Sequence, residues 1–212
     1  MIAPIVEASS YLYFKTDDRW RKMVHRLKYG GEWRLGLTFG ELYGAELRSS
    51  GLYDDIDLVV NSTYSEMHYP ITKELLLHGK NVLVEKPMAM NYTESAELLE
   101  KFKSAGKMLT VGYMMKYHNL HEKAREIIQA DGIGQVNDVR VQFSCWYPDI
   151  KGAWRQNKSL GGGGAIMDLG VHCIELLEYL LDDEIENVKA FYSTRTFSYE
   201  VEDGAVIVFK TR

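Results

Sequence analysis

In the middle of the chain, short apolar runs alternate with segments of helical periodicity, which constrains the fold more than any other feature. Apolar runs of strand length lie at Ile56–Asn61, Asn81–Val84 and Met108–Gly112. The helices expected between them span about 67–79 and 93–105, so each link is short. Buried strands separated by single helices form parallel sheets with right-handed crossovers. The sequence therefore predicts an α/β layer built on a parallel sheet.

The pattern changes after the third apolar run. A helix is expected at about 119–130, followed by a long strand at Val136–Trp146. A glycine-rich helix comes next, and two further strands are expected at Val188–Thr196 and Gly204–Lys210. Long strands with only one or two helices are typical of α+β domains, so this part is predicted to hold a largely antiparallel sheet.

Four consecutive glycines open the glycine-rich helix, which runs from Gly161 through Asp168 and His172. Asp168 and His172 are four residues apart, a spacing that places both side chains on one face of an α-helix. A carboxylate and an imidazole behind a glycine loop that lets a ligand approach closely are typical of an active-site wall. The alternative from spacing alone is a glycine turn before an ordinary buried helix, with local hydrogen bonds to both side chains.

Composition excludes several classes of protein. The 212 residues are 46% apolar and 26% charged, as in ordinary globular proteins, and the formal net charge is −5. We therefore expect no nucleic-acid or membrane partner, and no secretion signal precedes the first strand, so a cytoplasmic location is expected. The cysteines, Cys145 and Cys173, have no metal-ligand spacing, and no metal site is expected.

Several motifs in order resemble the Gfo/Idh/MocA family of NAD(P)-dependent oxidoreductases over about residues 54–212. The run Asp55–Thr63, followed by His68, resembles a nucleotide-domain strand and its loop, and Glu85-Lys86-Pro87 resembles the family's Glu-Lys-Pro signature. Val111-Gly-Tyr-Met114 resembles the strand that follows. Trp154-Arg155 and the stretch from Gly161 to His172 resemble the substrate-domain signature.

The resemblance implies particular site residues and a cofactor, NAD or NADP. The catalytic residues would be Lys86, Asp168 and His172. The residues implied to line the cofactor are Thr63, His68, Glu85, Lys86, Trp154 and Arg155. Oxidation of a secondary alcohol needs a base to take the hydroxyl proton while hydride leaves the same carbon, and a histidine titrates in the right range.

The implied activity is hydride transfer between NAD(P) and a hydroxyl of a small polyol, sugar-like or cyclitol substrate. One family feature is missing, because no glycine-rich turn of the GxGxxG type follows a strand near the N-terminus. We therefore expect weak or absent activity in the chain as it stands. The alternative is a sugar- or cyclitol-binding remnant without turnover.

The N-terminal segment shows a second resemblance. Residues 3–60, with the core His25-Arg-Leu-Lys-Tyr-Gly30, resemble the start of ComF-type phosphoribosyltransferases. That family's diphosphate-binding loop is absent, so phosphoribosyl chemistry ranks third among the hypotheses. Two resemblances that meet near Asp55–Val60 predict a chimeric chain.

Together the resemblances predict an α/β fold in three segments. Residues 1–60 would be a ComF-like segment in place of the first half of the nucleotide domain. Residues 61–117 would be the second half of a Rossmann-like nucleotide-binding domain, and residues 118–212 a truncated α+β substrate domain with a mainly antiparallel sheet. An uncovered sheet edge favours self-association, so a homo-oligomer is expected.

Overall fold

The structure, a computed structural model, describes residues 57–212, which form one compact unit. The strand predicted to begin at Ile56 enters this part only from Asp57 on. The ComF-like segment lies outside the described residues except for its last four, 57–60.

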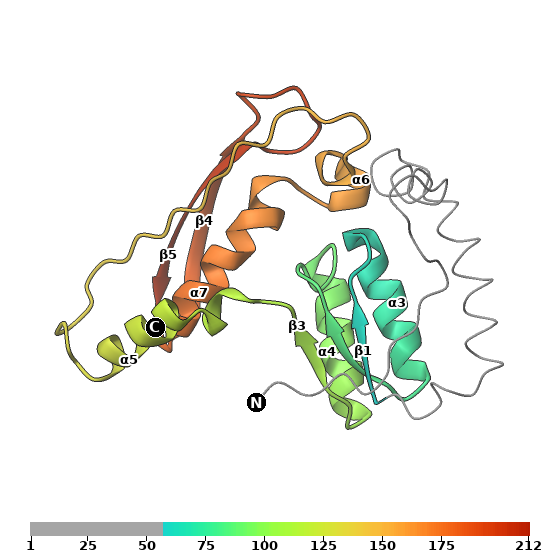
Figure 1. Cartoon of the computed structure of the whole chain (residues 1–212), viewed down its shortest axis with the longest axis horizontal. Helices are drawn as coiled ribbons and strands as arrows, with labels where there is room; N and C mark the ends of the chain where they lie inside the picture. The colour runs from blue at the N-terminus through green and yellow to red at the C-terminus, as the bar shows by residue number, and fades with distance from the viewer. Residues whose placement is uncertain (1–56) are drawn as a thin grey trace, which may run out of the picture. The chain divides into compact units, whose positions relative to one another are not determined.

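The first half of this unit is a parallel sheet covered by two helices (Figure 1). Its strands are β1 (Leu58–Asn61), β2 (Asn81–Val84) and β3 (Leu109–Val111), hydrogen-bonded in the order β1-β2-β3. Helix α3 (Ser65–Leu77) connects β1 to β2, and α4 (Tyr92–Ser104) connects β2 to β3. Both strand pairs are parallel, so the predicted α/β fold with a Rossmann-like parallel sheet is confirmed.

Helix α4 begins one residue earlier than predicted, at Tyr92, because Asn91 caps it. The Asn91 side chain accepts a hydrogen bond from the Glu94 backbone N–H at 3.0 Å. The Glu94 carboxylate accepts one in return from the backbone N–H of Met90 at 3.1 Å. These reciprocal bonds satisfy N–H groups that have no partner inside the helix, as in a capping box.

The core of the parallel layer lies between β2 and α4. Val82 and Val84 point from β2 toward Leu98 and Phe102 of α4, and all four are buried. The sequence pattern indicated Leu99 as an inward residue, but Leu99 is 51% exposed and Leu98 is fully buried. The shift by one position follows from the direction in which α4 faces the sheet, which only the packed helix pair decides.

We expect Leu98→Ala to lower the free energy of unfolding by about 2–5 kcal/mol, because it leaves a cavity against β2. The matched control is Leu99→Ala in the same helix, which should change it by less than about 1 kcal/mol. Urea denaturation of both variants measures the difference. Equal losses in the two variants would contradict the placement of Leu98 in the core.

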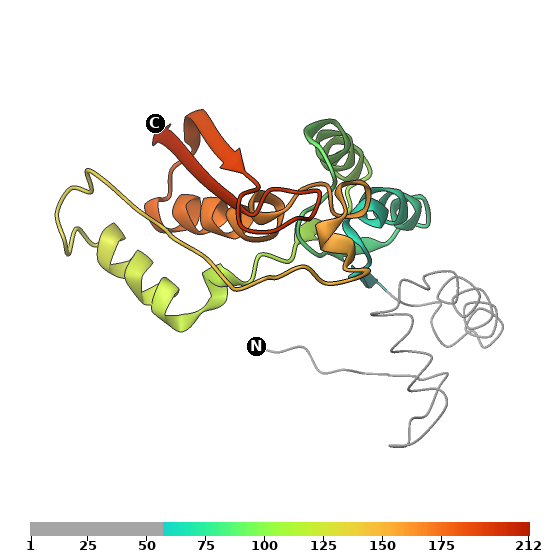
Figure 2. The same ribbon diagram turned by 90° about the horizontal axis from the view of Figure 1, so that it is seen from above.

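The second half of the unit is built around a helix and an antiparallel hairpin (Figures 1 and 2). Helix α7 (Val171–Leu181) packs against α5 (Asn119–Gln129) and is followed by β4 (Ile185–Ser193) and β5 (Gly204–Thr211). β4 and β5 pair antiparallel, with an irregularity in register between Glu186 and Lys189. The predicted antiparallel pairing of the last two strands is confirmed.

The strand predicted at Val136–Trp146 is not formed. Residues 135–150 run as an extended chain without regular secondary structure, passing from the end of α5 toward η2 (Trp154–Gln156). In this half of the unit, β4 and β5 are paired only with each other. A strand needs a neighbour that binds its N–H and C=O groups, and residues 136–146 have none among residues 57–212.

Three short helical segments precede α7. They are η2 (Trp154–Gln156), α6 (Lys158–Gly161) and the π-helical turn η3 (Ile166–Gly170). A further helical turn, η1 (Met115–Tyr117), lies between β3 and α5. Within residues 57–212, no helix is long and apolar enough to cross a membrane.

Candidate active site

Lys86 lies at the carboxyl end of the parallel sheet, two residues after β2 and directly before a cis proline, Pro87. Its ammonium group donates hydrogen bonds to the Asp168 carboxylate at 2.5 Å and to the Asp168 backbone carbonyl at 2.7 Å. The Lys86 side chain is only 14% exposed, so this ion pair is largely shielded from water. Open α/β sheets bind ligands at this edge.

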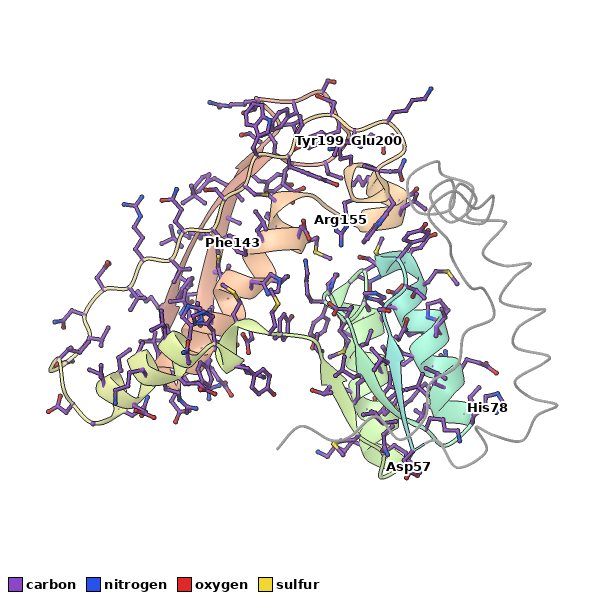
Figure 3. The ribbon with its side chains drawn as sticks, in the orientation of Figure 1. Asp57, His78, Phe143, Arg155, Tyr199 and Glu200 are labelled. Carbon is purple, nitrogen blue, oxygen red and sulfur yellow. The ribbon has the colours of Figure 1, made fainter. Side chains whose placement is uncertain are left out.

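The Asp168 carboxylate also lies 3.4 Å from Nε of Arg155. The guanidinium group of Arg155 sits 4.3 Å from the centre of the Trp154 ring, which in turn lies 5.2 Å from the ring of Tyr64. Figure 3 shows Arg155 between the π-helical turn and the end of the parallel sheet. Two cations therefore share one carboxylate, and a rim of aromatic rings flanks them.

The spacing predicts Asp168 and His172 on one face of an α-helix, but only His172 belongs to the regular helix α7. Asp168 lies in the π-helical turn η3, in which the N–H of Val171 donates to the carbonyl of Ile166 five residues back. In an α-helix the spacing of four residues would align the two side chains, but a π-turn contains more residues per turn. The Asp168 carboxylate instead lies beside the side chains of Lys86 and Arg155.

His172 is 5% exposed, and its Nδ1 is buried without a hydrogen-bond partner. The rings of Tyr113 and Phe143 lie 6.3 and 6.2 Å from its ring, and Figure 3 shows Phe143 on the extended segment beside α7. Burial lowers the pKa of His172, and the positive charge of Lys86 lowers it further. The negative charge of Asp168 raises this pKa by less than burial and Lys86 lower it. The ring is therefore neutral near pH 7 and can accept a proton.

The glycines before α7 lie close to other parts of the chain, and Gly164 shows the tightest of these contacts. A Cβ at Gly164 would lie 2.0 Å from the carbonyl oxygen of Glu202. That carbonyl accepts from the N–H of Ala165, and the Glu202 carboxylate accepts from the N–H of Ile166. Segment 201–202 thus binds the amino end of the helical stretch, which requires Gly164 to lack a side chain.

The remaining residues implied by the resemblance differ in exposure. Thr63 is exposed at the end of β1, and its hydroxyl donates to the Asn61 side chain at 2.8 Å. Glu85 is exposed beside Gly112, where a Cβ would lie 3.3 Å from its carboxylate. His68 is 1% exposed, so its ring faces the protein interior.

Sequence reasoning missed Tyr113 and Phe143 as neighbours of His172. Tyr113 directly follows Gly112 at the end of β3, a position that could have marked it, because side chains there reach the edge where parallel sheets bind ligands. Burial raises the pKa of Tyr113, and the nearby carboxylates of Glu175 and Glu178 raise it further. Phe143 carries no comparable signal, because it lies within the strand predicted at Val136–Trp146, far from His172 in sequence.

Two cavities bear on ligand binding. A small one of about 50 Å³ is lined by Asp168 and Arg155 and also by Tyr147 and Tyr199. It has room for only a few water molecules. A larger cavity of about 1000 Å³ lies between the end of α5, residues 134–140 and β5, and none of the implied site residues line it. The charged cluster, and not the larger cavity, is therefore the candidate site.

Comparisons with known protein families match two segments of this chain. Residues 44–113 match the family model described as "Oxidoreductase family, NAD-binding Rossmann fold", and residues 121–212 match "GFO/IDH/MocA C-terminal domain". The chain carries Gfo/Idh/MocA oxidoreductase domains. The first match begins at residue 44 and so includes residues 44–60, which the ComF-type resemblance had also claimed. The ComF-type interpretation of the residues before 44 stays a prediction.

Two of the curated relatives are named for anhydro-sugar and inositol substrates. The chain is 32% identical to 1,5-anhydro-D-fructose reductase of Ensifer adhaerens, over 72% of this chain and 46% of that protein. It is 28% identical to scyllo-inositol 2-dehydrogenase (NADP(+)) of Bacillus subtilis, over 57% of this chain and 33% of that protein. The chain thus spans less than half the length of these relatives.

A solved structure agrees. The crystal structure of GenD2 from gentamicin A biosynthesis, in complex with NAD, is 29% identical with a TM-score of 0.71. The match covers 84% of this chain and 52% of GenD2. This likeness supports the α/β fold of the described residues.

The lowered pKa of His172 predicts a pH dependence of stability. In the unfolded chain His172 takes up a proton near its ordinary pKa of 6.5, at a pH where the folded ring is still neutral. The unfolded state then binds more protons, so the free energy of unfolding falls as the pH drops below about 6.5 toward the folded pKa. Above this range the contribution is fully present.

We expect His172→Gln to remove this contribution, because glutamine does not titrate. Urea denaturation at about pH 7.5 and 5.5 should show a larger loss of stability in the natural protein than in the variant. The same loss in both proteins would contradict a depressed pKa at His172.

Proposed function

We propose that this protein takes part in hydride transfer between NAD(P) and a secondary hydroxyl of a sugar-like or cyclitol substrate. The observation that carries the proposal is the cluster of Lys86, Asp168 and a neutral His172 at the carboxyl end of a parallel sheet. The relatives' activities toward anhydro-sugars and inositols support the same substrate class.

The residues divide the work of alcohol oxidation. His172, kept neutral by burial and by the charge of Lys86, takes the hydroxyl proton. The Lys86 ammonium donates a hydrogen bond to the substrate oxygen and stabilises the negative charge that develops there. Asp168 holds Lys86 in place, so the ammonium group is already oriented before the substrate arrives.

The described residues fit the nicotinamide end of a dinucleotide. Thr63 and Glu85 follow neighbouring parallel strands at the sheet edge. The ring of Trp154 lies 5.2 Å from that of Tyr64, the residue after Thr63. These residues would hold the nicotinamide and its ribose, and the cofactor, when bound, supplies the hydride acceptor. The sequence holds no GxGxxG turn for the pyrophosphate, which predicts weak binding.

The missing glycine turn also supports a second candidate function. In that case the protein binds a sugar or cyclitol without turnover, and the charged cluster acts only as a binding wall. The two functions differ in cofactor binding, which is measurable directly. The expected cytoplasmic location and homo-oligomer stay predictions.

Titration with NADH and NADPH, followed by tryptophan fluorescence, tests the first step. Micromolar binding of either supports oxidoreductase function, whereas inositol or sugar binding without nucleotide binding supports the second candidate. Binding of neither class of ligand would contradict both.

If turnover is detected with inositols or 1,5-anhydro-sugars, we expect Lys86→Met to lower kcat/KM by roughly 10²-fold or more. The variant keeps the length of the side chain but cannot donate a hydrogen bond to the substrate oxygen. The control is Lys103→Met on the exposed side of α4, which should leave kcat/KM within about twofold. A similar effect of both substitutions would contradict the role of Lys86.

A further inference from the structure

The ring of His68 joins two loops at the carboxyl edge of the parallel sheet. Nδ1 lies 2.6 Å from the carbonyl oxygen of Pro87, and Nε2 lies 3.1 Å from the carbonyl oxygen of Thr63. His68 is 1% exposed, so the ring makes these contacts away from water. A buried carbonyl group without a donor costs about 1–3 kcal/mol, so the contact with the buried Pro87 stabilises the turn that carries it.

Each of the two carbonyls belongs to a loop that carries a candidate site residue. Pro87 directly follows Lys86, so the contact with the Pro87 carbonyl holds the turn that carries Lys86. The ammonium group of this lysine binds Asp168. Thr63 follows β1 and is exposed at the edge proposed to hold the cofactor. The ring is therefore a cross-tie between the turn after β2 and the loop after β1.

The backbone and polar side chains near His68 are held by Asn61. Asn61, at the end of β1, donates to the carbonyl of His68 at 3.2 Å and to the hydroxyl of Thr72 at 3.1 Å. The same Asn61 side chain accepts from the hydroxyl of Thr63 at 2.8 Å. Asn61 thus holds the Thr63 loop from one side, and the His68 ring holds it from the other.

A neutral imidazole carries one N–H and donates to one carbonyl, and only the doubly protonated ring donates to both. The shorter of the two contacts is the one from Nδ1 to Pro87. In a ring with a single N–H, that N–H therefore belongs to Nδ1, and the contact of Nε2 with the Thr63 carbonyl becomes a hydrogen bond only when Nε2 also carries a proton.

From this geometry we infer that His68 is a positioning residue that holds the Lys86–Pro87 turn and the Thr63 loop at a fixed separation. It acts through these two loops and touches no substrate. The consequence for catalysis rests on the proposed function, whereas the two ties are properties of the folded chain and are testable without turnover.

Two substitutions separate the ties. His68→Asn keeps an amide nitrogen where Nδ1 lies, and His68→Gln keeps one where Nε2 lies. The asparagine variant should therefore preserve the bond to Pro87 and lose the bond to Thr63, and the glutamine variant should do the reverse. His68→Leu lacks both donors and serves as the control, and far-UV circular dichroism confirms that all variants fold.

The first readout is the rate at which acetic anhydride modifies Lys86, measured by mass spectrometry. We expect about a tenfold faster rate in His68→Gln and His68→Leu, and a rate within about twofold of the natural protein in His68→Asn. The second readout is hydrogen exchange in residues 61–67, which should quicken in His68→Asn and His68→Leu but not in His68→Gln.

Equal changes in the asparagine and glutamine variants would overturn the inference, because a ring that merely fills space would not separate the two loops. If the protein turns over, His68→Gln should lower kcat and His68→Asn should raise KM for the nucleotide. If it does not turn over, the proposed function fails, while the acetylation and exchange results still decide whether His68 holds the two loops.

Discussion

The ion pair between Lys86 and Asp168 joins the two halves of the described unit at the candidate site. Lys86 comes from the turn after β2, and Asp168 comes from the π-helical turn before α7. Because the lysine is largely shielded from water, removing its partner would leave a poorly solvated charge, which is costly. The position of the ammonium group therefore depends on two elements that lie 82 residues apart in sequence.

Each end of this ion pair is supported by backbone hydrogen bonds. On the side of the sheet, the His68 ring reaches the carbonyl of the proline that follows the lysine. On the side of α7, Glu202 binds the N–H groups of Ala165 and Ile166. Catalytic groups must be held within fractions of an ångström of a productive geometry, and side chains supported in this way lose less freedom when a ligand binds.

The electrostatics of the cluster follow from the same arrangement. His172 is neutral because it is buried and because the charge of Lys86 is close, and Asp168 offsets this effect only in part. A base that is neutral near pH 7 and a cation held by a carboxylate are the parts that alcohol oxidation needs. Arg155 adds a second cation at the exposed side of the same carboxylate.

Local sequence signals predicted most helices and strands of this protein, whereas packing decided which residues face the core and which side chains pair. Apolar runs were enough to predict β1, β2, β3 and the last two strands, because the residues of each run are neighbours in sequence. Motif order predicted Lys86, Asp168 and His172 as catalytic residues, and that assignment stays a prediction. The unpaired segment at Val136–Trp146, the inward turn of Leu98 and the choice of Lys86 over His172 as partner of Asp168 required the tertiary structure. Each depends on a neighbour that is distant in sequence, and no local pattern specifies whether that neighbour is present or which way it faces.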